Sequence, residues 1–140
     1  MSSDESPTTM VRRLEAATNA HDLDALVACF APEYVNETPL HPARGFGGRE
    51  QVRDNWRTIF AAVPDVSAVV LRADRVGDLV WSEWEMSGHR RDGATHLMRG
   101  VILFTVAGAV ATRARFYLEP VDGGDADAAA SVRAAVGATT

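Results

Sequence analysis

The chain has 140 residues, of which 46% are hydrophobic and 24% are charged, and its formal net charge is −5 at pH 7. This length allows one globular domain with a sizeable core. The acidic balance argues against nucleic-acid binding, which needs clustered basic residues to neutralise phosphates. The longest apolar stretch, residues 101–111, is too short to span a bilayer, and the polar, acidic start does not resemble a secretory signal. We therefore expect a cytoplasmic protein that binds neither nucleic acid nor membrane.

The first half of the chain predicts three helices and one short strand, from apolar spacing and from capping and breaking residues. In chain order we expect a flexible leader at 1–7, a helix from Thr8 or Thr9 to Ala20, a short helix capped by Asp22 and stopped by Pro32, a strand at 33–38, a loop at 39–48 and a helix at 49–62. The last helix has a clean apolar stripe at helical spacing.

The second half predicts four long strands joined by tight turns, which pair as an antiparallel meander. They span residues 66–75, 79–90, 96–106 and 110–119. The Gly-, Asp- and Ala-rich tail at 122–140 is expected to be mostly disordered, although 127–136 could form a frayed helix. The folded domain is therefore predicted at residues 8–121.

Side chains alternate between the two faces of a strand, and in the predicted strands this alternation separates an apolar face from a charged one. The charged set is Glu83, Glu85, Arg99, Arg113, Arg115 and Glu119, with Trp81 and Tyr117 among them. Because unpaired buried charge is costly, we expect the apolar set to face the helices and the charged set to form ion pairs on the opposite face. That face could be solvated or a dimer surface. The competing interpretation is a catalytic array inside a pocket.

Four local features, taken in order, resemble the nuclear transport factor 2-like superfamily and its SnoaL-like members. They are Asn19-Ala-His-Asp-Leu-Asp-Ala-Leu26 with Phe30-Ala31, Tyr34-Val-Asn36, Gly48-Arg49-Glu50-Gln51-Val52, and Arg115-Phe-Tyr-Leu-Glu-Pro120. The resemblance covers about residues 8–121. It implies an α+β fold, a cone-shaped α+β barrel in which a strongly curved antiparallel sheet wraps around three helices.

The superfamily includes limonene epoxide hydrolases, ketosteroid isomerases, polyketide cyclases and non-catalytic binding domains, so the resemblance leaves the reaction open. Tyr34 and Asn36 resemble the Tyr-x-Asn pair that holds the water in the epoxide hydrolases. The positions of the Asp-Arg-Asp set of those enzymes hold Phe116, Trp84 and Met86, which argues against epoxide hydrolysis. Asn36 also stands where the isomerases place an Asp base, and an amide cannot act as one.

The polyketide cyclases use an inward acid on a late strand, and Glu119 is the nearest candidate here, although the strand phase turns it outward. If the protein is an enzyme, Tyr34 and Asn36 are predicted to position the substrate, with His41 or Glu119 as acid or base. The histidines show no metal-ligand spacing, and Cys29 is the only cysteine, so we predict no metal and no cofactor.

The candidate ligand-binding residues combine the possible polar positions with the aromatic inward face. They are Tyr34, Asn36, His41, Trp56, Phe60, Trp84, Met86, Met98 and Phe116. The alternatives are a filled core for the apolar residues and a solvated loop for His41. The resemblance favours a pocket of roughly 300–600 Å³.

The leading hypothesis is a small-molecule-binding domain for an apolar or amphipathic molecule, with isomerase, lyase or hydrolase activity as an open possibility. The second is a non-catalytic dimerisation or protein-interaction module that uses the charged face, and a homodimer is expected.

Overall fold

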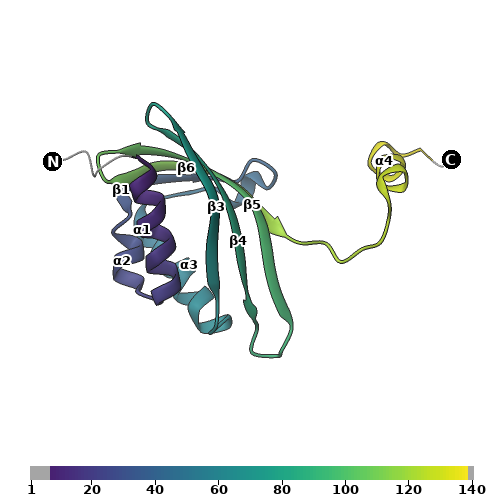
Figure 1. Cartoon of the computed structure of the whole chain (residues 1–140), viewed down its shortest axis with the longest axis horizontal. Coiled ribbons are helices and arrows are strands. Elements are labelled where there is room, and N and C mark those ends of the chain that lie inside the picture. Colours follow the sequence, from purple (N-terminus) through teal and green to yellow (C-terminus); the bar gives the residue numbers. More distant parts are fainter. Residues whose placement is uncertain (1–6, 139–140) are drawn as a thin grey trace.

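The computed structural model describes residues 7–138 and confirms the predicted α+β class. In chain order the elements are α1 (Pro7–Ala20), α2 (Leu23–Val27), β1 (Phe30–Glu37), the 3₁₀ helix η2 (Pro42–Arg44), β2 (Phe46–Gly47), α3 (Arg49–Ala62), β3 (Ser67–Val76), β4 (Leu79–His89), β5 (Thr95–Ala107), β6 (Val110–Pro120) and α4 (Ala128–Val136). The strands form one six-stranded sheet in the order β2-β1-β6-β5-β4-β3. Helices α1, α2 and α3 all lie on one side of this curved sheet (Figure 1).

The sheet is open at β2 and β3, so the cone is not a closed barrel. Its pairs are antiparallel except for β1 and β6, which run parallel. Within β5, Gly100 has a positive φ of 156°, and a Cβ at this position would clash with the backbone oxygen of Tyr117 on β6. Glycine is therefore required where β5 and β6 approach each other in the curved sheet.

The predicted boundaries hold for α3 and approximately for the four long strands, but the start of the chain differs. Helix α1 begins at Pro7, one or two residues before the predicted caps, and the rest of the predicted leader lies outside the described residues. Asp22 caps α2 as predicted, its side chain accepting a hydrogen bond from the Ala25 N–H at 3.0 Å. That helix ends at Val27, and Phe30 belongs to β1 because it pairs with Ala111 of β6.

The apolar face of the meander packs against the helices, as predicted. Val80, Ile102 and Phe104 are at most 1% exposed, and they belong to the same buried cluster as Met10 and Val11 of α1. Burying these side chains together supplies the main driving force for folding. The core therefore lies between α1 and the middle of the sheet.

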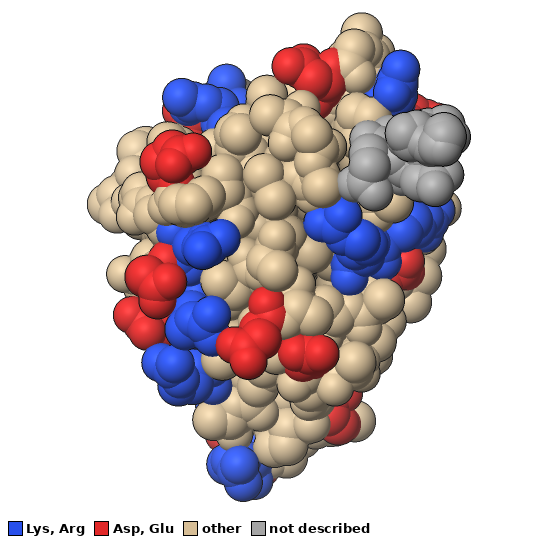
Figure 2. All heavy atoms as spheres, turned by 90° about the vertical axis from the view of Figure 1, so that its left-hand side faces the viewer, with Lys and Arg blue, Asp and Glu red and all other residues tan. Residues whose placement is uncertain are grey.

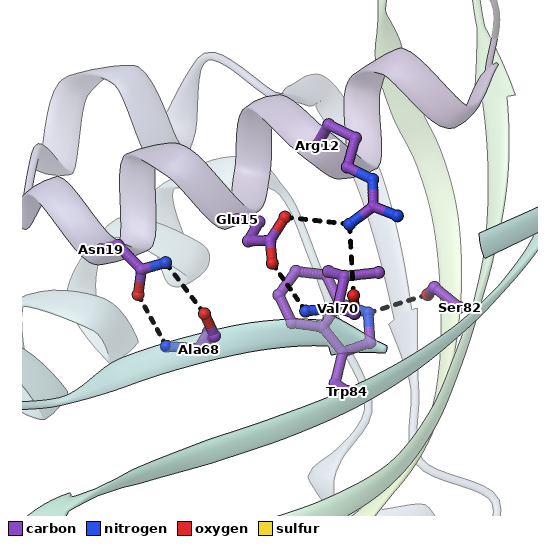
Figure 3. A network of polar contacts seen from close by, with 7 residues as sticks. All are labelled: Arg12, Glu15, Asn19, Ala68, Val70, Ser82 and Trp84. Carbon is purple, nitrogen blue, oxygen red and sulfur yellow. Dashed lines mark hydrogen bonds and ion pairs between the residues drawn. The ribbon is translucent and has the colours of Figure 1, made fainter. Parts of the chain in front are cut away.

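Polar side chains of α1 bind the free edge of β3, the last strand of the sheet (Figure 3). Asn19 accepts from the Ala68 N–H at 2.7 Å and donates to the Ala68 carbonyl at 2.9 Å. Glu15 accepts from the Val70 N–H at 2.7 Å, and Arg12 donates to the Val70 carbonyl at 3.2 Å. These bonds replace the partner strand that the edge lacks and prevent pairing with another chain there.

The opposite face of the sheet carries part of the predicted ion pairs, while Glu83 and Arg115 have no ion-pair partner among residues 7–138. Arg99 of β5 binds Glu85 of β4 at 2.6 Å, and Arg113 of β6 binds Glu37 of β1 at 3.1 Å. Trp81 is 52% exposed. On the side of α1 and α2, arginine and acidic side chains are interspersed, so the described part of that face has no large patch of one sign (Figure 2).

The tail contains a helix, α4, which Asp127 caps by accepting from the Ala130 N–H at 2.9 Å. It lies apart from the sheet and the other helices (Figure 1), and the disorder expected for 122–140 stays a prediction. Among residues 7–138, no helix is long and apolar enough to cross a membrane. Within the same residues, no group of three His, Cys, Asp or Glu side chains could hold a metal ion.

Candidate functional site

A cavity of about 360 Å³ lies between α3, β1 and the end of the sheet formed by β4, β5 and β6. It falls within the volume predicted from the sequence. Its lining is mostly apolar, with a few polar groups. The lining residues are Phe30, Tyr34, Asn36, Thr38, Arg44, Phe46, Val52, Asn55, Trp56, Ile59, Met86, His96, Met98, Phe116, Leu118 and Glu119.

Tyr34 and Asn36 form the polar base of this cavity. They lie two residues apart on β1, so both side chains point to the inward face of the sheet. The Tyr34 hydroxyl donates to Asn36 Oδ1 at 2.7 Å. Tyr34 is fully buried, with Phe30 and Phe46 packed edge-on against its ring at centroid distances of 4.7 and 6.1 Å. Burial raises the pKa of the Tyr34 phenol far above its ordinary value, so the group is a neutral donor.

The hydrogen bond from Tyr34 fixes what Asn36 offers to a ligand. With its oxygen occupied, the amide presents Nδ2, which has no partner among residues 7–138. No buried side-chain nitrogen or oxygen in that range lacks a partner, so Nδ2 is accessible. Since Asn36 is itself only 8% exposed and lines the cavity, its free N–H groups are donors to whatever occupies that space.

Helix α3 supplies one wall through the apolar stripe seen in the sequence. Of this helix only Val52 is fully buried, while Trp56 and Ile59 are half-buried because they face the cavity. The predicted site residue Phe60 is not part of the lining. It continues the stripe past the cavity, tilted against Trp56 at 5.5 Å and stacked on His21 at 4.6 Å.

Five polar residues with exposed or half-exposed side chains line the cavity, and we call them the mouth residues. They are Thr38, Arg44, Asn55, His96 and Glu119. Glu119 was expected to form an outward cross-strand ion pair; it does lie opposite Arg99 in the strand register, but its ion-pair partner is His41. Its Oε1 lies 3.1 Å from Nε2 of His41, because the turn closed by the His41 N–H on the Thr38 carbonyl brings this loop against the end of β6.

His41 was predicted to contact the ligand and instead lies behind Glu119, outside the lining. Trp84 was also predicted to line the cavity, and it is 1% exposed in the filled core. Its indole N–H donates to Ser82 Oγ at 2.8 Å, and the Ser82 hydroxyl donates to the Ile102 carbonyl at 2.7 Å. The indole therefore has its partner inside the sheet and needs no ligand.

The structure thus brings six of the nine predicted residues together around the cavity. They are Tyr34, Asn36, Trp56, Met86, Met98 and Phe116. Sequence reasoning missed Arg44 and Asn55, which are polar and carry no periodic signal, whereas Glu119 had been named only as a possible acid or base. It could have found Val52 and Ile59, which belong to the same helical stripe as Trp56.

The SnoaL-like domain family model matches residues 11–114. That match covers well over half of the chain, and the protein belongs to the SnoaL-like domain family. No curated protein matches the sequence.

Solved structures with less than 25% identity share the fold. The candidate polyketide cyclase IdmH from Streptomyces antibioticus is 22% identical, with a TM-score of 0.70 over 81% of this chain and 91% of that one. A Mycobacterium tuberculosis protein solved in complex with estradiol-17β-hemisuccinate is also 22% identical, with a TM-score of 0.70 over 80% and 93% of the two chains. A Catenulispora acidiphila protein with a ketosteroid isomerase-like fold, solved with trimethylamine, is 23% identical, with a TM-score of 0.68 over 77% and 84%.

Proposed function

We propose that the protein binds a small apolar or amphipathic molecule in the cavity, with Tyr34 and Asn36 at its base. The cavity itself carries the proposal. Its volume of about 360 Å³ lies within the range of ligand sites, and it combines apolar walls with a few convergent polar groups. Structures of the same fold with bound small molecules support this use of the fold. A cytoplasmic location remains a prediction from the sequence.

The chemistry of the site favours binding over catalysis at the base of the cavity. A neutral phenol and an amide orient a carbonyl or hydroxyl group, but neither takes a proton at neutral pH. Glu119 is the one carboxylate in the lining, and its contact with His41 makes this pair the candidate for any proton transfer. We therefore place a reaction, if the ligand undergoes one, at the mouth.

A thermal-shift screen against steroids, terpenoids and aromatic polyketides tests the proposal. Ligand at about 100 times its Kd stabilises the native state by about 2.7 kcal/mol. Ile59→Trp is designed to fill the cavity from α3, and Val69→Trp is the matched control on the exposed face of β3. We expect compounds to raise the Tm of the wild type and of Val69→Trp but not of Ile59→Trp. A panel that stabilises none of the three proteins contradicts the proposal.

A second candidate function is dimerisation through the opposite sheet face, and the exposed apolar groups there favour it. Trp81 and Val69 are 52% and 48% exposed, and Val69 lies opposite Glu85 of the Arg99–Glu85 ion pair in the strand register. Aromatic and arginine side chains are enriched in interfaces.

We expect a dimer in size-exclusion chromatography that Arg99→Glu splits, because the reversed charge would face Glu85 and the partner chain. Arg57→Glu, on the exposed side of α3, should leave it intact. A wild-type protein that elutes as a monomer contradicts this candidate and leaves the first untouched.

A further inference from the structure

The polar groups around the cavity are not balanced between donors and acceptors. The oxygen of Asn36 is occupied by Tyr34, and the oxygen of Asn55 accepts from Gln51 Nε2 at 2.8 Å. In both amides the oxygen thus already accepts one hydrogen bond, whereas the N–H groups have no partner among residues 7–138. The Trp56 indole N–H also has no partner among residues 7–138, and none of these nitrogens is buried without one. A ligand that satisfies them must offer acceptor oxygens.

Arg44 adds a positive charge to this set of donors. It is the one arginine in the cavity lining, and within residues 7–138 it has no hydrogen bond or ion pair. Its position is held by the 3₁₀ turn η2, in which the Arg44 N–H donates to the His41 carbonyl at 2.9 Å and the Gly45 N–H to the Pro42 carbonyl at 3.2 Å. A guanidinium on a hydrogen-bonded turn at a cavity mouth, without a protein partner among residues 7–138, suits a planar anion, which it binds through two parallel hydrogen bonds.

The acid at the mouth limits how much negative charge the ligand carries. Glu119 lines the same cavity, lies too far from Arg44 for an ion pair, and contacts His41 instead. A dianion such as a phosphate monoester would face this carboxylate with one arginine to offset it. A carboxylate carries a single charge and matches the guanidinium geometry.

We propose that the ligand is an apolar molecule bearing a carboxylate, which pairs with Arg44 at the mouth while the apolar body lies against Trp56 and Met98. This inference rests on the proposed function, since it assigns the ligand class of the same cavity. It makes Arg44 the residue that selects acids over neutral molecules of the same shape.

The test compares matched acids and methyl esters by isothermal titration. The probes are estradiol-17β-hemisuccinate, anthraquinone-2-carboxylate and a diterpene carboxylate, each beside its methyl ester. We expect at least one acid to bind the full-length protein about 5–10-fold more tightly than its ester. Arg44→Gln should remove this preference by weakening acid binding far more than ester binding. Arg44→Lys should keep part of it, and 0.5 M salt, about three times the physiological ionic strength, should reduce it.

Arg75→Gln is the matched control, because Arg75 is an exposed arginine on β3 outside the cavity lining, and the preference should survive there. Esters that bind as tightly as acids overturn the inference while leaving the proposed function standing. A preference that survives in Arg44→Gln also overturns it. If no acid and no ester binds, the proposed function fails as well, so the two failures are distinguishable.

Discussion

Tyr34 holds the amide of Asn36 in one orientation, and this single bond decides what the base of the cavity offers. In Tyr34→Phe the Asn36 oxygen loses its donor, which costs about 1–3 kcal/mol for a buried polar group. We expect that loss in the free energy of unfolding measured in urea, together with weaker ligand binding. Tyr117→Phe is the control, because Tyr117 lies outside the cavity lining. Equal stability and affinity in the two variants would contradict an orienting role.

At the residue scale, alternation along β1 was enough to predict that Tyr34 and Asn36 share an inward face. The same rule placed Trp84 inward, which is correct, but not in the cavity. The inward face of β4 is covered by α1 at one end and by the cavity at the other, and strand periodicity does not distinguish them. Ser82, two residues before Trp84, accepts the hydrogen bond of the indole N–H, so Trp84 can be buried without a ligand. The sequence alone does not show that these two side chains are in contact.

At the element scale, the bonds from α1 to the edge of β3 stabilise the sheet where it lacks a neighbouring strand. Asn19→Ala leaves the N–H and carbonyl of Ala68 without protein partners, and we expect unfolding to become easier by about 1–3 kcal/mol. Amide hydrogen exchange at Ala68 should also become faster.

Asn55→Ala, which removes an asparagine from the exposed part of α3, is the matched control for that substitution. It should leave both stability and exchange at Ala68 close to wild type. Unchanged exchange at Ala68 in Asn19→Ala would show that the strand edge does not depend on this contact.

The elements themselves were largely predictable, because apolar spacing and capping residues act locally. The contact between α1 and β3 was not, since Glu15 and Val70 are 55 positions apart in sequence. Phe30 was wrongly predicted in a helix, again because its structure depends on a residue distant in the sequence. Its extended backbone depends on pairing with Ala111 of β6, and that partner overrides the helical spacing of its neighbours.

At the scale of the whole molecule, the order of the elements indicated the fold, and the family match agrees with it. The cavity lies beside the Pro42–Arg44 turn, whose Arg44 lines it, and the sheet that forms its other wall contains Gly100 with its positive φ. Neither feature has a periodic signal. Arg44, which lines the mouth of the cavity, was therefore a part of the candidate site that sequence reasoning missed.

The three tryptophans can test whether a ligand binds in the cavity, because each occupies a different environment. Trp56 lines the cavity, Trp81 lies on the opposite sheet face and Trp84 is buried in the core. The most direct measurement is a ¹H–¹⁵N NMR titration of their indole N–H signals with a compound that raises the Tm. Binding in the cavity predicts that the Trp56 signal shifts while the Trp81 signal stays in place. A shift of Trp81 with Trp56 unmoved would contradict the account.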